Sequence, residues 1–195
     1  MEEFILDLTL VENLIYNYMR LILLLLLLPC FCFSQKYFIE DSKVSFYSWA
    51  PLEDISAISN KLEGVVDFDS GDFFFRIPIS TFIFPSSLMQ KHFNEKYMES
   101  DIYSMSSFKG NFNEKILLSK NQEINISAEG ILNIHGIDQD VVIETNLKVS
   151  NSKVLFDSKF DIFLKDYKIK VPKIVRMNIA DTISVNVSGN LIINK

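Results

Sequence analysis

Residues 86–110 read SSLMQKHFNEKYMESDIYSMSSFKG, and this stretch interrupts an otherwise regular pattern of side chains. Within it, three large apolar side chains recur every four residues, which is the spacing of one face of an α-helix. The three are Met89, Phe93 and Tyr97. Ser87 is placed to cap the first turn, and Gln90 three residues later completes a capping-box pattern. The stretch therefore predicts one amphipathic helix.

On both sides of this stretch, apolar and polar residues alternate with period 2, as they do in strands with one buried face. Turn residues such as the Asp-Ser-Gly-Asp at 69–72 separate the alternating runs. Pro78 indicates a sheet edge or a bulge, and residues 51–61 are expected to be irregular or a short helical turn. The pattern predicts eight strands, at 36–48, 62–69, 73–84, 107–117, 123–135, 141–149, 154–165 and 183–193.

Eight antiparallel strands with one apolar face close well into a barrel, because closure removes exposed strand edges. We therefore expect a mainly β fold, an eight-stranded antiparallel barrel with one amphipathic helix packed against it. A β-sandwich fits the alternation nearly as well. The polar faces carry Lys, Glu and Asp, which argues against an outer-membrane barrel with a lipid-facing exterior.

The composition suits strands that enclose an aromatic-rich interior. The 195 residues include 17 Phe and only 6 Gly, and 48% of them are hydrophobic. The formal net charge is −6 and no basic stripe is present, so we do not expect nucleic acid as a partner.

The N-terminal residues have the features of a secretory signal. A basic residue precedes the apolar run Leu21–Phe33, which is short for a bilayer span. We expect a signal region at 1–34 and, after cleavage, a barrel domain at 35–195 that has neither of the two cysteines. Residues 1–18 are acidic, which suggests that translation begins at Met19. The signal predicts a periplasmic or secreted protein, and an uncleaved membrane anchor is the alternative.

Side chains suited to catalysis are scarce in this sequence. It has no G-x-S-x-G motif and no Gly-rich phosphate loop, and His92 and His135 are its only histidines. The two histidines could bind zinc if they met in space, with Glu95 or Glu99 nearby. Structural roles fit them better, with His92 hydrogen-bonded at the barrel rim and His135 fixing a turn. We therefore expect no enzymatic activity and no cofactor.

The apolar side chains of the predicted helix, Met98 included, either pack against the sheet or line a pocket. Six or more inward-facing rows together with an apolar helix could surround a long cavity, and such cavities bind apolar molecules. Phe and Met suit a flexible hydrocarbon, because Met adapts to irregular shapes.

Several segments resemble members of the YceI-like family. LMQKHFNEKYMESDIYSMSSFKG (88–110) is similar to the family segment in which a helix with a His runs into a strand. AEGILNIHGIDQDVVI (128–143) is similar to the family's hairpin, and FDIFLKDYKIKVP (160–172) to its penultimate strand and following loop. VSFYSW and GVVDFD fit as well, so the resemblance covers about residues 36–195. Ser104 departs from it, because the family often has Pro there.

The resemblance, to a Bacteroidetes-type member, implies a lipocalin-like, extended eight-stranded barrel with a helix over it. Characterised members are secreted or periplasmic and hold a polyisoprenoid-type lipid in the barrel. We therefore predict an exported protein that binds an elongated apolar ligand without catalysis. The predicted lining residues are Phe73, Phe75, Ile77, Met89 and Phe93, and the predicted rim residues that orient a headgroup are His92 and Tyr103.

The expected partner is thus an apolar small molecule, an isoprenoid or another lipid. Membrane contact is expected only through the signal segment, and a homodimer is left open. Two alternatives remain. A structural or interaction module would have an interior filled by Phe side chains, with no cavity larger than a few waters. A metal-dependent enzyme would bring the rings of His92 and His135 within reach of one ion.

Overall fold

The computed structural model describes residues 14–20, 36–150, 153–172, 175 and 178–193. Contacts divide the chain into two units, Met1–Phe33 and Ser34–Lys195. In the first unit, residues 14–20 are helical. The rest of the predicted signal region, its cleavage site and both cysteines lie outside the described residues. Among the residues that are described, no helix is long and apolar enough to cross a membrane.

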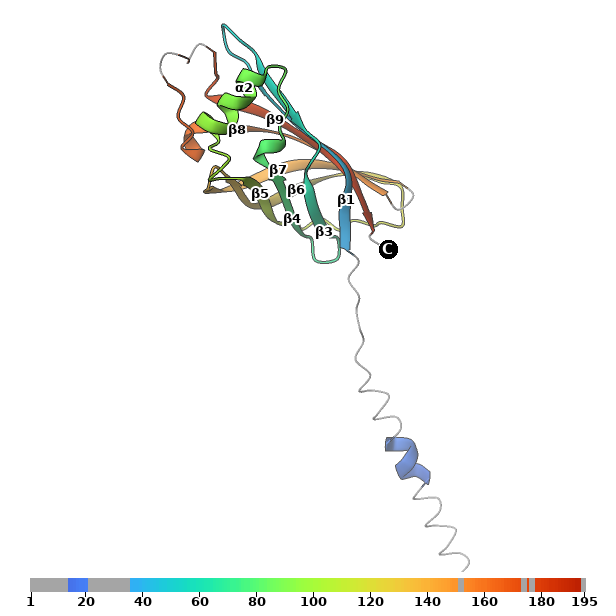
Figure 1. Cartoon of the computed structure of the whole chain (residues 1–195). Helices are drawn as coiled ribbons and strands as arrows, with labels where there is room; N and C mark the ends of the chain where they lie inside the picture. The colour runs from blue at the N-terminus through green and yellow to red at the C-terminus, as the bar shows by residue number, and fades with distance from the viewer. Residues whose placement is uncertain (1–13, 21–35, 151–152, 173–174, 176–177, 194–195) are drawn as a thin grey trace, which may run out of the picture. The chain divides into compact units, whose positions relative to one another are not determined.

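The described part of the second unit contains nine strands, joined in one antiparallel sheet (Figure 1). β1 pairs with β3 along one edge and with β9 along the other, which closes eight of these strands into a barrel. The predicted barrel is confirmed, and the alternative of a two-sheet sandwich is wrong. The strands are β1 (Lys36–Ser48), β2 (Ile55–Ser59), β3 (Glu63–Asp67), β4 (Asp72–Pro78), β5 (Met105–Asn111), β6 (Gln122–Ile134), β7 (Ile137–Ser150), β8 (Lys153–Phe163) and β9 (Thr182–Ile193).

The ninth strand, β2, lies in the segment 51–61 that was expected to be irregular or helical, so that expectation is wrong. β2 pairs with the second half of β1 in the same register in which β3 pairs with the first half, so the two strands are parts of one interrupted path. The alternation of β2 is hard to recognise, because its buried positions hold the small residues Ala57 and Ser59 while Ile58 is exposed. On its other side, Ile58 forms an isolated antiparallel bridge with Ile83, through two backbone hydrogen bonds of 3.1 and 2.8 Å.

The predicted inward-facing rows of the long strands are confirmed by burial. On β6, Ile126, Ala128 and Leu132 are buried, whereas Asn125 and Glu129 between and beside them are exposed. β8 repeats the pattern, with three buried side chains that alternate with exposed ones. These three are Val154, Phe156 and Ser158. The interior of the barrel is therefore largely apolar and its outer surface polar, as alternation with period 2 requires.

β4 is shorter than the strand expected at 73–84. It ends at Pro78, and the next residues form a 3-10 helix, η1 (Ile79–Thr81). Proline has no N–H to donate to the neighbouring strand, and the Pro78 carbonyl accepts a hydrogen bond from the Thr81 hydroxyl at 2.6 Å. In the β3–β4 turn, Gly71 has φ 81°, and a Cβ there would collide with the Phe112 carbonyl oxygen.

The predicted helix is present in two parts. Residues Ser87–His92 form the α-helix α2, and Phe93–Tyr97 form the π-helix η2. The wider π turn is closed by a hydrogen bond from the Met98 N–H to the Phe93 carbonyl at 2.9 Å. Such turns occur inside helices and are frequent at functional sites.

The first residue of α2 differs from the expected one. Ser86, not Ser87, is the N-cap, because its side chain accepts the N–H of Met89 at 3.4 Å. Gln90 does not complete a capping box, since its side-chain oxygen accepts the N–H of Phe84 at 3.4 Å instead. The helix start is therefore one residue earlier than predicted.

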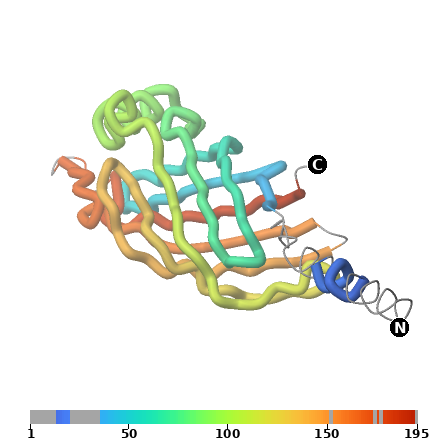
Figure 2. Tube along the Cα trace, turned by 90° about the horizontal axis from the view of Figure 1, so that it is seen from below, coloured from blue at the N-terminus to red at the C-terminus, as the bar shows by residue number. Residues whose placement is uncertain are grey.

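The two ends of the barrel differ (Figure 2). One end, here called the helix end, carries α2, η2, the β1–β2 loop and the segment that begins with the 3-10 helix η3 (Leu164–Tyr167). The opposite end is closed by an aromatic cluster, in which the ring of Phe68 lies 5.0 Å from that of Tyr37 and 6.0 Å from that of Phe112. Access to the interior is thus expected at the helix end.

Candidate functional site

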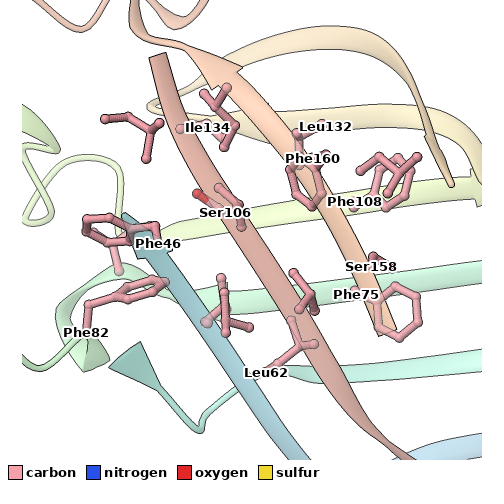
Figure 3. A pocket seen from close by; sticks show the side chains of 18 of the residues that line it. Phe46, Leu62, Phe75, Phe82, Ser106, Phe108, Leu132, Ile134, Ser158 and Phe160 are labelled. Atoms are coloured by element: carbon pink, nitrogen blue, oxygen red, sulfur yellow. The ribbon is translucent and has the colours of Figure 1, made fainter. Parts of the chain in front are cut away.

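A cavity of about 440 Å³ lies inside the barrel and is lined by side chains from all nine described strands and from α2 and η2. Figure 3 shows lining side chains that point into this common space, with the rings of Phe46, Phe75, Phe82, Phe108 and Phe160 among them. The volume is that of roughly fifteen water molecules at about 30 Å³ each. The alternative of a filled core, which allowed no cavity larger than a few waters, is therefore wrong.

The predicted ligand-binding residues fall in two groups. Those that line the cavity are Phe73, Phe75, Ile77, Met89, His92 and Phe93. Tyr103 does not line it. Its ring packs edge-on against His135, with 4.4 Å between the ring centroids. Whether the lining residues bind a ligand stays a prediction.

Sequence reasoning missed further lining residues. The missed aromatic and aliphatic residues include Phe46, Leu62, Phe82, Phe108 and Phe160. Phe160 lies on the same face of β8 as Phe156 and Ser158, and period-2 alternation predicts that this face points inward. Phe160 could therefore have been predicted as a lining residue. Leu62 lies between β2 and β3, and Phe82 follows η1. No periodic signal places these two.

Phe93 of η2 fixes the helical segment to the barrel wall. Its ring stacks on Phe46 of β1 at 5.5 Å and contacts Phe84 at 4.9 Å and Phe82 at 5.9 Å. Aromatic pairs in such offset and edge-on arrangements contribute about 0.5–1.5 kcal/mol each beyond the area they bury. The four rings therefore form an apolar wall on one side of the cavity, contributed by β1, the segment after η1 and η2.

Two buried serines of the cavity wall differ in how their hydroxyl groups are satisfied. Ser158 and Thr145 hydrogen-bond to each other at 2.8 Å, and Thr145 donates to the carbonyl of Ile143 at 3.4 Å. The hydroxyl of Ser106 on β5, also buried, has no hydrogen-bond partner among the described residues. An unpaired buried hydroxyl costs about 1–3 kcal/mol. Polar groups are thus few in this wall, and one of them is unsatisfied.

Polar side chains of the cavity lining lie at the helix end. Glu53 of the β1–β2 loop and Asn178 both line the cavity, and the Asn178 amide donates to the Glu53 carboxylate at 3.3 Å. Beneath them, the buried Ser48 hydroxyl accepts the N–H of Ala180 at 3.0 Å. His92 also lines the cavity, and its ring makes no hydrogen bond to any described residue, so its hydrogen bond at the rim stays a prediction.

His135 fixes a turn, as predicted, by joining three segments at the helix end. Its backbone is left-handed at φ 53°, its Nδ1 lies 3.2 Å from the Tyr167 carbonyl oxygen, and its Nε2 lies 2.9 Å from a Glu99 carboxylate oxygen. Both ring nitrogens are thus occupied by protein groups. Within the described residues, no three His, Cys, Asp or Glu side chains are placed to hold a metal ion.

Two tyrosines at the helix end, the half-buried Tyr97 and the buried Tyr167, stay neutral over a wide pH range. Burial raises the pKa of Tyr97, which lines the cavity. Burial, with a smaller contribution from the Asp166 carboxylate, raises the pKa of Tyr167 to about 12. Neither phenol therefore brings a charge to this apolar region at neutral pH.

Solved structures with the same fold include a polyisoprenoid-binding domain from Saccharophagus degradans. It shares 13% identity with the chain at a TM-score of 0.70, over 81% of this chain and 98% of the other. BcnA from Burkholderia cenocepacia shares 16% identity at a TM-score of 0.66, over 77% and 95% of the two chains. A YceI protein from Campylobacter jejuni shares 17% identity at a TM-score of 0.51, over 69% and 82%. At such identities the similarity establishes the fold alone.

Comparison with curated proteins finds no match. Comparison with family models matches residues 39–191 to the YceI-like domain, which is most of the chain and nearly all of the barrel. The matched region holds every residue that lines the cavity. The chain therefore belongs to the YceI-like family.

Proposed function

We propose that this protein binds an elongated apolar molecule, an isoprenoid or a similar lipid, inside the barrel and carries out no catalysis. The observation that supports this most strongly is the largely apolar cavity of about 440 Å³ inside the barrel. Small-molecule sites are typically mostly apolar pockets of about 300–1,000 Å³ with a few polar groups. The structurally similar Saccharophagus degradans domain is described as polyisoprenoid-binding, which supports the ligand class.

Affinity in such a site comes from removing hydrocarbon from water, at about 25 cal/mol per Å² of apolar surface. Phe75 and Ile77 of β4 and Phe93 of η2 would contact the ligand chain. Met89 would adapt to its bends, since methionine has three rotatable bonds and a polarizable sulfur. His92, whose ring is free of hydrogen bonds to described residues, would orient a polar headgroup at the helix end.

The proposal is tested by titrating delipidated protein with an isoprenoid alcohol such as geranylgeraniol. We expect saturable one-to-one binding with a negative heat-capacity change, the robust sign of apolar burial. Val187 of β9 packs against two groups of core side chains, one that includes Phe68 and one that includes Phe84. It also lines the cavity, so Val187→Trp should divide the cavity and abolish binding. Val187→Ile is the matched control and should bind nearly as the wild type does. Unchanged binding by the Trp variant would contradict the proposed site.

We also propose that the protein is exported and acts in the periplasm or outside the cell, as a Bacteroidetes-type member of the family. This rests on the signal-like sequence at 1–34. N-terminal sequencing of the protein recovered from its own cells should begin near Gln35. A mature protein that begins at Met1 or Met19 would contradict export through a cleaved signal.

A further inference from the structure

The polar side chains of the cavity wall are distributed unevenly along the barrel. Toward the closed end, apolar lining residues pack in one cluster with Phe68 and Phe112, among them Val66, Phe73, Ile126, Leu147 and Leu191. Described polar residues of the lining lie in the middle of the barrel or toward the helix end, and they include Ser48, Glu53, His92, Ser106, Ser158 and Asn178. An amphiphile in this cavity would therefore place its hydrocarbon toward the closed end and its polar group toward the helix end.

Ser106 lies where β5 begins, at the helix end of the wall. It follows Met105, the first residue of β5, and it is paired with Ile77 of β4. The next inward pair toward the closed end is Phe108 with Phe75, and these two residues also line the cavity. On these two strands, Ser106 is therefore the inward-facing polar side chain that directly precedes an aromatic wall.

The hydroxyl of Ser106 has no hydrogen-bond partner among the described residues, although the side chain is buried in the wall. Buried polar groups are nearly always paired, so an unpaired one in a cavity wall indicates a partner that the protein does not itself supply. The hydroxyl oxygen is covered, and rotation about the Cα–Cβ bond to another staggered rotamer can turn it toward the cavity. A serine hydroxyl can donate to an acceptor or accept from a donor, so it suits either a carbonyl or a hydroxyl group.

The charged side chains of the described lining favour an uncharged polar group on the ligand. The Glu53 carboxylate accepts from the Asn178 amide and would repel an anion. The guanidinium of Arg76 is paired with the Glu63 carboxylate, through Nε and Nη2 at 2.8 Å each. No lysine or arginine of the lining that the structure describes is thus free to neutralise a phosphate or carboxylate. Burying an unpaired charge costs far more than burying a neutral oxygen that finds one hydrogen bond.

We propose that Ser106 hydrogen-bonds an uncharged oxygen of the bound lipid, a hydroxyl or a carbonyl, and that the cavity thereby selects neutral oxygenated isoprenoids over the corresponding hydrocarbons and phosphate esters. The hydrocarbon chain then runs from Ser106 past Phe75 and Phe108 toward the closed end. The inference rests on the proposed function, because it names the ligand class and a specificity-determining residue of the same cavity.

The test compares three ligands with one chain, namely geranylgeraniol, geranylgeranyl phosphate and the hydrocarbon that lacks the hydroxyl. Each displaces the neutral fluorescent probe N-phenyl-1-naphthylamine from the delipidated full chain. The ratio of the dissociation constants, hydrocarbon over alcohol, should be about fivefold larger for the wild type than for Ser106→Ala, the effect of one neutral hydrogen bond. Comparing the two ratios cancels the different solubilities of the ligands. The phosphate should bind the wild type more weakly than the alcohol does, and tighter binding of the phosphate would overturn the proposal.

Matched variants separate this hydroxyl from others in the same wall. Ser158→Ala removes a buried lining hydroxyl that is already paired with Thr145 at 2.8 Å, so it should leave the wild-type ratio unchanged. Ser106→Thr keeps a hydroxyl at the position and should retain the ratio that Ser106→Ala loses. An equal loss in Ser106→Ala and Ser158→Ala, or a wild-type ratio in Ser106→Ala, would overturn the assignment.

A spectroscopic measurement reports on the hydrogen bond itself. The carbonyl stretching frequency of geranylgeranial, the aldehyde with the same chain, falls when the carbonyl accepts a hydrogen bond. In infrared difference spectra the band should lie lower in the wild type than in Ser106→Ala, and identical frequencies would overturn the proposal. If alcohol and hydrocarbon both bind but Ser106→Ala leaves their ratio unchanged, the proposed function stands and this inference fails. If none of the ligands binds, both fail.

Discussion

The unpaired hydroxyl of Ser106 should make the native protein less stable than it would be with an apolar side chain at this position. Ser106 and Ser158 are both buried, both on strands and both in the cavity wall (Figure 3), but only Ser158 has a hydrogen-bond partner. The same substitution at the two positions, Ser106→Val and Ser158→Val, adds the same apolar atoms next to the same cavity. The two variants therefore differ mainly in whether the lost hydroxyl made a hydrogen bond.

The expected signs are opposite. Ser106→Val removes an unsatisfied hydroxyl, which costs the native protein about 1–3 kcal/mol, so the free energy of unfolding should rise by about 1–2 kcal/mol. Ser158→Val breaks the 2.8 Å hydrogen bond to Thr145, which is worth about 1 kcal/mol net. The added methyl group offsets part of this loss, at about 0.8 kcal/mol if fully buried. Ser106→Val should thus exceed Ser158→Val in stability by roughly 2 kcal/mol.

Urea unfolding of delipidated protein measures this difference, because bound ligand would itself add stability. With a denaturant slope of about 2 kcal/mol per molar, the two midpoints should differ by about 1 M urea. If the wall around Ser106 were tightly packed, the larger side chain would cost about 1–3 kcal/mol instead. A Ser106→Val protein less stable than Ser158→Val would therefore refute the description of this wall.

Three further outcomes follow from the geometry. Phe93→Ala should lower the free energy of unfolding by about 2–3 kcal/mol and speed ligand dissociation, because three ring contacts are lost; equal stability and off-rate would count against the aromatic wall. Gly71→Ala should destabilise the β3–β4 turn by at least about 1 kcal/mol in urea unfolding, since φ is 81° and the Cβ would meet a carbonyl oxygen. The pKa of Tyr167 is raised to about 12, so its contribution to stability is complete below pH 10 and is lost as pH rises towards 12. Tyr167→Phe should flatten that decline, as followed by phenolate absorbance and circular dichroism.

The sequence predicted the barrel because its rows of alternating residues are long and consistent. Strands such as β6 and β8 bury most of one face, and a shift by one residue would expose that face, so the pattern leaves little freedom. β2 was not predicted because its buried positions hold the small residues Ala57 and Ser59 while Ile58 is exposed, so large apolar side chains do not mark its inner face. The extra length assigned to β4 failed at Pro78, where the missing N–H and a local hydrogen bond end the strand.

The site was predictable in part. Side chains on regular rows, such as Phe75 and Ile77, point into the cavity because period 2 decides their direction. Tyr103 could not be placed, because it follows η2 in a loop whose path depends on the contact with His135. A barrel has a cavity when the side chains from opposite strands do not fill the space between them. The alternation along a single strand shows which side chains point inward, but not whether they reach those of the opposite strands.

The central claim is that the barrel holds an apolar molecule, and native mass spectrometry of the protein isolated gently from its own cells tests it most directly. The account predicts a species heavier than the polypeptide, together with an isoprenoid-like or other lipid molecule that organic solvent releases from it. Protein that is isolated at the mass of the polypeptide alone, and that takes up no geranylgeraniol when this is supplied, would contradict the account.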